Sequence, residues 1–259
     1  MTQSRRTFIS ASAAATVGLA TAPAAGQTPA QSARPVFDVP PTHVAVAGSG
    51  DVFPVRRIYC VGRNFAEAGV ATGREPPFFF QKPTDAIQYV PAGSVGENPY
   101  PSLTKNYHYE VELVCALGSG GTNISVANAL RHVFGYAVGL DMTRRDLQRT
   151  LGDEKKPWEV GKSFDRSAPI GPIHRSDIIG HFPNGAISLS VNGALKQEAR
   201  LEQMIWSVAQ LVSKLSEAFE LKAGDLIYCG TPDNVGPVVK GDRIVCRIDR
   251  LPDLSVRIV

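Results

Sequence analysis

The sequence predicts an α+β protein that is mostly β, with few and short helices. Three observations support this class. The chain has 24 Gly and 19 Pro, which indicate many turns. Short runs rich in β-branched and aromatic residues recur between those turns, and only two segments show a helical repeat. With 43% hydrophobic and 20% charged residues, the 259-residue chain has the composition of a globular protein that can bury its own core.

The chain divides into three predicted parts. Residues 1–26 have the features of an export signal, because Arg5 and Arg6 precede a mildly apolar stretch that ends in small residues. Paired arginines followed by Phe8 are typical of a twin-arginine signal, so we expect the mature protein in the periplasm. The alternative is a cytosolic protein with an Ala-rich start. Residues 27–55, which include several prolines, are expected to form a linker and N-terminal segment, and residues 56–259 the catalytic domain.

Strands are predicted where apolar runs end at Gly, Pro or Asn. After one of these runs, Asn192-Gly193 predicts a tight hairpin, because both residues tolerate a positive φ. The predicted strands are Arg57–Val61, Phe78–Gln81, Tyr109–Leu117, Tyr136–Leu140, Ile187–Val191, Leu226–Cys229, Arg243–Ile248 and Ser255–Val259.

Two segments are predicted as helices. Apolar residues recur at three- and four-residue intervals from Met204 to Phe219, which indicates one amphipathic helix. A shorter helix is expected from Thr143, a candidate cap with Asp146 three residues later, to about Leu151.

Charge and cysteine usage exclude several classes. The formal net charge of +3 falls to +1 without residues 1–26, and no basic cluster indicates a nucleic-acid partner. No later stretch has the 18 or so apolar residues of a membrane span. The four cysteines lie in apolar runs without C-x-x-C spacing, so we expect buried free thiols rather than disulfides or a zinc site. They are Cys60, Cys115, Cys229 and Cys246.

Three acids form the candidate metal site. Glu110 and Glu112 are two residues apart on a predicted strand, so their side chains share one face, about 7 Å apart. Taken alone, the two acids favour the solvated side of an edge strand, but the same face continues with the apolar Val114 and Ala116. Asp141 ends another apolar run, where the alternative is an acid at a helix start. A hard divalent cation would offset the repulsion between buried carboxylates.

Two side chains after Asp141 could bind a carboxylate substrate. Arg145 and Gln148 are three residues apart on the predicted short helix and therefore share a face. An arginine can hold a carboxylate through paired hydrogen bonds. The alternative for Arg145 is a surface ion pair with Asp141 or Asp146.

Several ordered motifs together resemble the fumarylacetoacetate hydrolase family, specifically its fumarylpyruvate hydrolase and acylpyruvase branch. The resemblance extends from about Ile58 to the C-terminus. Its motifs are Glu110-x-Glu112-Leu113, Asp141-x-Thr143-x-Arg145-Asp146-x-Gln148, Gly161-Lys162-Ser163-Phe164-Asp165 and Gly230-Thr231-Pro232, preceded by Val61–Phe65 and Glu75–Pro83.

The resemblance implies a role for each matched position. Glu110, Glu112 and Asp141 would bind Mg²⁺, or Mn²⁺ or Ca²⁺ in its place. Lys162 would be catalytic and contact the substrate. The other substrate-binding residues would be Arg145, Gln148 and Thr231.

The resemblance also implies a fold and a reaction. The fold would be a mixed β-sandwich roll, in a protein that is usually a homodimer. The reaction would be hydrolysis of a C–C bond in a diketo acid such as fumarylpyruvate, with pyruvate leaving as an enolate that the metal stabilises.

One part of the family pattern is missing. The family activates water with a histidine and a glutamate, and their positions are held here by Ala68 and Ala71. Glu67 is a candidate substitute base only if burial raises its pKa, and a solvated loop carboxylate is the competing interpretation. Two other functions therefore stay open. One is decarboxylation or tautomerisation of a β-keto acid such as oxaloacetate, and the other is non-catalytic binding of a metal and a keto acid.

Overall fold

The computed structural model describes residues 34–65 and 75–259. Pro40–Val259 form one compact unit. The predicted export signal at residues 1–26 lies outside the described residues, and so do Glu67, Ala68 and Ala71.

Strands make up most of the regular structure, and their bounds follow chain order. They are β1 His43–Ala45, β2 Val52–Pro54, β3 Arg57–Gly62, β4 Phe78–Lys82, β5 Ile87–Tyr89, β6 Val95–Asn98, β7 Tyr107–Tyr109, β8 Val111–Leu117, β9 Val133–Leu140, β10 Thr143–Arg144, β11 Ala168–Ile170, β12 His174–Arg175, β13 Ala186–Val191, β14 Ala194–Arg200, β15 Asp225–Tyr228, β16 Gly236–Val238, β17 Arg243–Ile248 and β18 Leu254–Ile258.

The helices are few and short. They are α1 Val126–Ala129, α2 Arg145–Asp153, α3 Ser176–Ile179 and α4 Val208–Ala218, with 3₁₀ turns η1 Thr84–Ala86, η2 Leu130–His132, η3 Glu159–Gly161 and η4 Leu201–Gln203. The predicted α+β, mostly β class is confirmed, and so is the mixed character of the sheets.

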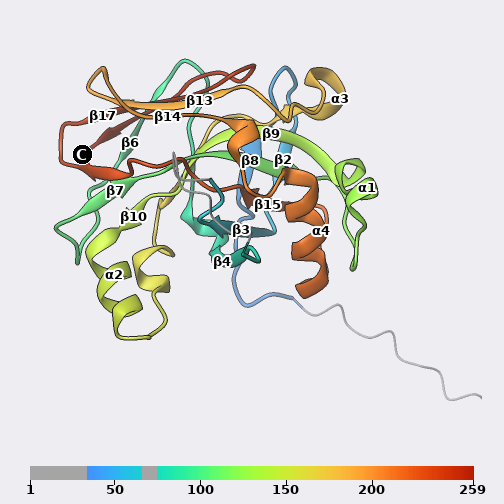
Figure 1. Ribbon diagram of the computed structural model, residues 1–259, viewed down its shortest axis with the longest axis horizontal. Coiled ribbons are helices and arrows are strands. Elements are labelled where there is room, and N and C mark those ends of the chain that lie inside the picture. Colours follow the sequence, from blue (N-terminus) through green and yellow to red (C-terminus); the bar gives the residue numbers. More distant parts are fainter. Residues whose placement is uncertain (1–33, 66–74) are drawn as a thin grey trace, which may run out of the picture. The chain divides into compact units, whose positions relative to one another are not determined.

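Two large sheets organise the compact unit. One has the order β4-β3-β15-β8-β9-β11-β5, with β12 also paired to β9, and the other has the order β14-β13-β17-β18-β6. Most neighbours are antiparallel, but β3 and β15, β5 and β11, and β6 and β18 are parallel. In Figure 1, β13, β14 and β17 lie over β8 and β9.

Successive side chains of β8 point to opposite faces of its sheet and pack into two different apolar clusters. Leu113 belongs to an apolar cluster that also contains Leu189 of β13 and Leu211 of α4. Val114 points to the opposite face and joins a second cluster with Phe53 of the β1–β2 hairpin. Both faces of β8 are therefore buried, so Glu112 on this strand and Glu110 just before it do not lie on a solvated edge.

The hairpin prediction is confirmed, whereas both helix starts differ from the prediction. Asn192 and Gly193 have φ of 51° and 82° and join β13 to β14. The amphipathic helix begins at Val208, not at Met204, after Ser207 as N-cap. The shorter helix begins at Arg145, because Thr143 pairs with His108 in a β ladder and does not cap it.

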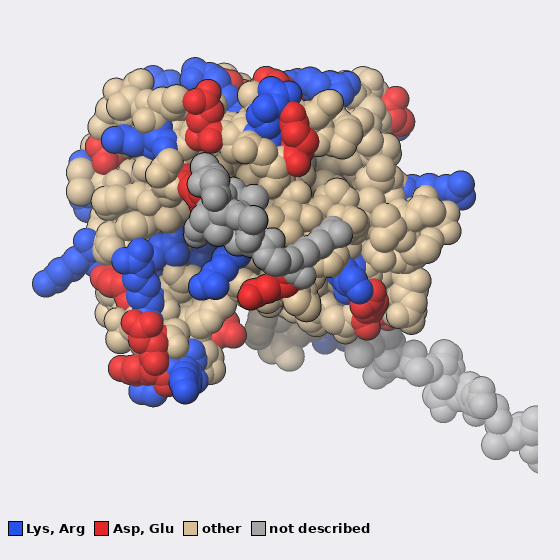
Figure 2. Space-filling view, in the orientation of Figure 1, with Lys and Arg blue, Asp and Glu red and all other residues tan. Residues whose placement is uncertain are grey.

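The four cysteines are buried and free, as predicted. Among the described helices, none has the length and apolar character needed to cross a membrane. On the face shown in Figure 2, acidic and basic side chains are interspersed.

We expect Leu211→Ala to lower the free energy of unfolding by about 2–5 kcal/mol, because it would leave a cavity where α4 meets the sheets. Leu211 is fully buried. Lys214→Ala on the exposed side of the same helix is the control, and its effect should stay within about 0.5 kcal/mol. Urea unfolding of both variants measures the difference, and equal destabilisation would contradict this description of the core.

Candidate metal centre and active site

The candidate metal centre lies where the start of β8 meets the end of β9. Glu110 precedes β8, Glu112 is its second residue, and Asp141 directly follows β9. The register pairs Val111 with Leu140, and the Asp141 amide donates to the Glu110 carbonyl at 2.9 Å. Antiparallel pairing therefore brings the three acids together. They are all buried, and one carboxylate oxygen from each lies within 4.8 Å of the others.

Lys162 lies between two of the acids. Its side-chain Nζ donates to Glu110 Oε2 at 2.7 Å and to Asp141 Oδ2 at 2.8 Å. Lys162 is itself buried and sits directly after the 3₁₀ turn Glu159–Gly161. Lys162 is therefore part of the buried cluster and not a surface lysine.

Glu112 is held by a main-chain amide rather than by a lysine or arginine side chain. Its Oε2 accepts a hydrogen bond from the Gly230 amide at 2.8 Å. Gly230 has a φ of +98°, and a Cβ at this position would lie 2.6 Å from Cβ of the buried Asn64. A glycine is required here both by the backbone conformation and by this close approach.

Burial and repulsion between the acids have their largest effect on the pKa of Glu112. Burial raises the pKa of Glu112 well above its usual value, and the charges of Asp141 and Glu110 raise it further. For Asp141, burial alone would raise the pKa, but Lys162 and Lys82 together bring it below its usual value. For Lys162, burial would lower the pKa, but Asp141 and Glu110 hold it above the usual value.

The donor set fits a hard divalent cation. All three candidate ligands are carboxylates, the type that Mg²⁺, Mn²⁺ and Ca²⁺ prefer. Asp141 Oδ1 lies 2.8 Å from Lys82 Nζ, yet it accepts no hydrogen bond within the described part of the chain. A buried oxygen in this state and a carboxyl with a strongly raised pKa both indicate a site that a cation would complete.

Arg145 and Gln148 lie beside this centre. Arg145 is buried and pairs through Nη2 with Glu110 Oε1, while its Nη1 donates to Gln148 Oε1 at 2.6 Å. The alternative of a surface ion pair for Arg145 is wrong. Asp146 is bound elsewhere, by the Thr104 hydroxyl and the Lys105 amide.

Thr231 is connected to the strand that carries the acids through one side chain, that of Gln197. Its Oγ1 accepts a hydrogen bond from Gln197 Nε2 at 3.0 Å, and Gln197 Oε1 accepts from the Val111 amide at 3.1 Å. Gln197, fully buried in β14, therefore joins the Gly230-Thr231-Pro232 segment to the strand between Glu110 and Glu112.

Sequence reasoning missed Lys82 and Gln197 as parts of the site. Lys82 lies within the matched segment Glu75–Pro83, and no motif marks Gln197. Neither has a spacing pattern that relates it to the acids, because the contacts form only when distant strands meet. Glu67, the candidate base, lies outside the described residues.

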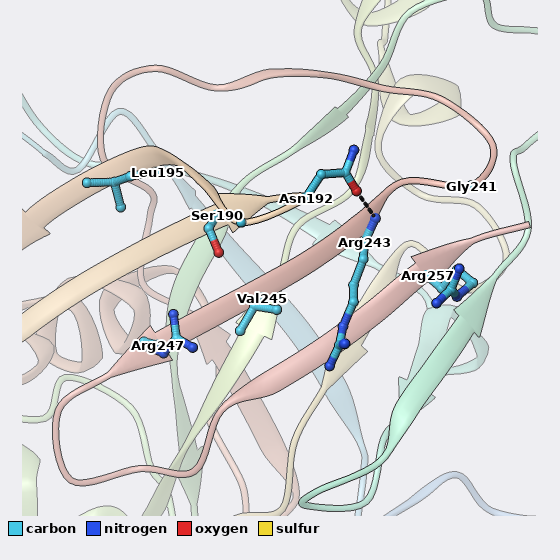
Figure 3. Close-up of a pocket in the computed structure, with 9 residues that line it drawn as sticks. Ser190, Asn192, Leu195, Gly241, Arg243, Val245, Arg247 and Arg257 are labelled. Atoms are coloured by element: carbon cyan, nitrogen blue, oxygen red, sulfur yellow. Dashed lines mark hydrogen bonds between the residues drawn. The ribbon is translucent and has the colours of Figure 1, made fainter.

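A hollow of about 720 Å³ lies on the outer face of the five-stranded sheet and contains none of the predicted site residues. Figure 3 shows Arg243 and Arg247 of β17 and Arg257 of β18 around it, with Asn192 accepting a hydrogen bond from the Arg243 amide. Arg247 is paired with Asp253. This hollow lacks acids that could hold a cation, so we place the active site at the carboxylate cluster.

Comparison with known proteins agrees with this geometry. Residues 57–259 match the family model described as fumarylacetoacetate (FAA) hydrolase C-terminal. The chain belongs to the fumarylacetoacetate hydrolase family. The resemblance found from the sequence motifs is thereby confirmed.

Proteins similar to this chain are named for two kinds of activity. A crystal structure of fumarylpyruvate hydrolase from Pseudomonas aeruginosa, in complex with Mn²⁺ and pyruvate, is 53% identical, with a TM-score of 0.85 over 87% of this chain and 99% of that one. A fumarylpyruvate hydrolase from a Ralstonia species is 40% identical over 71% of this chain and 93% of its own. An oxaloacetate tautomerase from Escherichia coli is 35% identical over 76% and 90%.

We expect metal affinity to fall as the pH is lowered. A cation needs the ionised form of Glu112, whose pKa is raised, so protons compete with the cation below that pKa and not above it. The Mn²⁺ dissociation constant, measured by isothermal titration calorimetry, should rise by up to about tenfold per pH unit on the acid side.

The matched control for this titration is Glu198→Gln, at an exposed position of β14, which should leave the pH dependence unchanged. Glu112→Gln should weaken binding and flatten its pH dependence. An affinity of the unaltered protein that stays constant between about pH 5 and pH 8 would contradict a ligand with a raised pKa.

Proposed function

We propose that this protein is a divalent-metal-dependent hydrolase that cleaves the C–C bond of acylpyruvates such as fumarylpyruvate. The observation that carries the proposal is the buried cluster of Glu110, Glu112 and Asp141 with Lys162 between two of its members. The likeness to a fumarylpyruvate hydrolase crystallised with Mn²⁺ and pyruvate supports this substrate class.

The three acids would hold Mg²⁺ or Mn²⁺. Bound there, the cation would supply Lewis-acid stabilisation of negative charge on the oxygens of the 2-oxo acid. The chain provides a second source of positive charge in Lys162. Two of its three N–H groups are used by Glu110 and Asp141, which leaves one to donate to a substrate oxygen.

Arg145, Gln148 and Thr231 would orient the substrate. The Gln148 oxygen already accepts from Arg145, so its NH₂ group is the part suited to a substrate oxygen. Thr231 follows Gly230, whose amide binds Glu112, and its hydroxyl is fixed by Gln197. The Thr231 hydroxyl is thus held by the buried side chain of Gln197 rather than by a mobile one.

The overall reaction consumes one water. The water oxygen bonds to the carbonyl carbon of the fumaryl part, the C–C bond to the pyruvyl methylene breaks, and that methylene carbon gains a proton. Fumarate and pyruvate result. The residues that remove and return these protons are the part of the family pattern that Ala68 and Ala71 replace, so we expect a reduced rate rather than none.

We expect Lys162→Met to lower kcat/KM for fumarylpyruvate by roughly 10²–10³-fold, because one donor to the developing negative charge is lost. Lys156→Met is the control, since Lys156 is an exposed lysine paired with Glu154. Pyruvate release with saturating Mn²⁺ measures both variants. Similar rates for Lys162→Met and the unaltered protein would remove Lys162 from the reaction.

A second candidate function is tautomerisation or decarboxylation of a β-keto acid such as oxaloacetate. It is favoured by Ala68 and Ala71, because these reactions need enolate stabilisation but less activation of water. The 35% identity to an oxaloacetate tautomerase supports the same class. Non-catalytic binding of a metal and keto acid is the remaining alternative.

The double substitution Ala68→His with Ala71→Glu separates these functions. If the protein is a hydrolase that has lost its general base, we expect the double substitution to raise pyruvate release from fumarylpyruvate by roughly 10²-fold or more. Oxaloacetate turnover is measured in parallel, and a tautomerase should show it before the substitution. If fumarylpyruvate cleavage is already fast and the substitution does not raise it, another group must serve as base.

Export and assembly belong to the same proposal. Arg5 and Arg6, followed by a mildly apolar stretch and small residues, support transport of the folded protein to the periplasm through a twin-arginine signal. Family resemblance supports a homodimer.

A further inference from the structure

Lys82 at the end of β4 is a second lysine at the metal centre, and its side chain has no solvent exposure. Its Nζ lies 2.8 Å from Asp141 Oδ1 and contacts three further oxygens. These are the Met142 carbonyl at 3.3 Å, the Ser167 hydroxyl at 3.1 Å and the Lys162 carbonyl. An ammonium group has three N–H donors, so these three hydrogen bonds use all of them.

These contacts connect three distant segments of the chain. Lys82 reaches the end of β9 through Asp141 and Met142, and it reaches the segment 162–167 at both of its ends. That segment is also closed by Ser167, whose hydroxyl donates to the Lys162 carbonyl at 3.0 Å. Lys82 thus fixes the main chain of Lys162 while that residue's ammonium group binds Glu110 and Asp141.

Lys82 also completes a charge balance. Among the described residues, the buried acids Glu110, Glu112 and Asp141 face three buried cations, which are Lys82, Arg145 and Lys162. With the acids ionised, as binding of a cation requires, these formal charges cancel. A divalent cation alone would therefore leave two uncompensated positive charges in a buried site, which is unfavourable.

We propose that Lys82 is a positioning residue that couples the divalent cation to a doubly charged anionic ligand, so that the two bind as a pair. This inference rests on the proposed function, because it concerns the same site. A 2-oxo acid in its enolate form carries two negative charges, one on the carboxylate and one on the neighbouring oxygen. Such a dianion restores neutrality once the cation is bound, whereas the cation alone does not.

Removal of the Lys82 charge should weaken this coupling. Without it the protein groups carry a net charge of −1, so the cation binds more readily by itself and gains less from a dianion. A purely structural role for Lys82 predicts the reverse for the cation, because a displaced Asp141 would weaken metal binding with or without an anion.

The experiment measures Mn²⁺ affinity by calorimetry, with and without saturating oxalate, which carries two charges on adjacent carboxylates. In Lys82→Met and Lys82→Gln we expect Mn²⁺ alone to bind roughly tenfold more tightly, and the enhancement by oxalate to be roughly tenfold smaller. Lys82→Arg keeps the charge and should keep the enhancement. Lys214→Met removes a charge from the exposed face of α4 and should change neither quantity.

Each outcome decides the inference. If the neutral variants fold, by circular dichroism, and keep the full enhancement by oxalate, Lys82 does not couple the ligands. Weaker binding of Mn²⁺ alone in both neutral variants would also overturn the proposal and indicate a structural role. If the neutral variants do not fold, loss of the enhancement in Lys82→Arg would overturn it. If the unaltered protein binds neither Mn²⁺ nor oxalate, the proposed function itself fails, which is a distinguishable result.

Discussion

Mutual repulsion among three buried carboxylates is the constraint on which the rest of the site depends. Glu110, Glu112 and Asp141 have oxygens within 4.8 Å of one another inside the protein. Buried charges are tolerated only when they are paired or coordinated. The surrounding groups meet this requirement, since Lys82, Lys162 and Arg145 each reach an acid, and Glu112 receives a main-chain amide.

The fold holds these groups in place because each lies on or next to a paired strand or a short turn. β8 and β9 carry the acids and are buried on both faces, so their ends are fixed by packing. β15 places Gly230, and Gln197 of β14 links the Thr231 segment to β8. A rigid scaffold of this kind keeps each ligand oxygen close to the position that metal binding and oxyanion stabilisation both demand.

The charged residues that the family resemblance implies lie together at the site, whereas the resemblance predicts that alanines replace the groups that move protons. Metal ligands and oxyanion stabilisers act in hydrolysis, decarboxylation and tautomerisation alike, because each reaction passes through an enolate-like state. Water activation is needed only for hydrolysis. We therefore expect the alanines at 68 and 71 to bear on which of these reactions is fast.

The sequence by itself determined the local features. The alternation of side chains along a strand predicted that Glu110 and Glu112 share one face. Asn192-Gly193 predicted the hairpin, and apolar runs predicted most of the strands. Each of these features depends only on neighbours within a few residues. Motif order also identified the family. Tertiary structure alone decided the start of α2, where pairing of Thr143 with His108 overrode a capping pattern. It also decided the roles of Lys82 and Gln197. Lys82 pairs with Asp141, 59 residues further along the chain, and Gln197 binds Thr231 and Val111, which are 34 and 86 residues away. These residues meet because segments distant in sequence are neighbours in the folded protein.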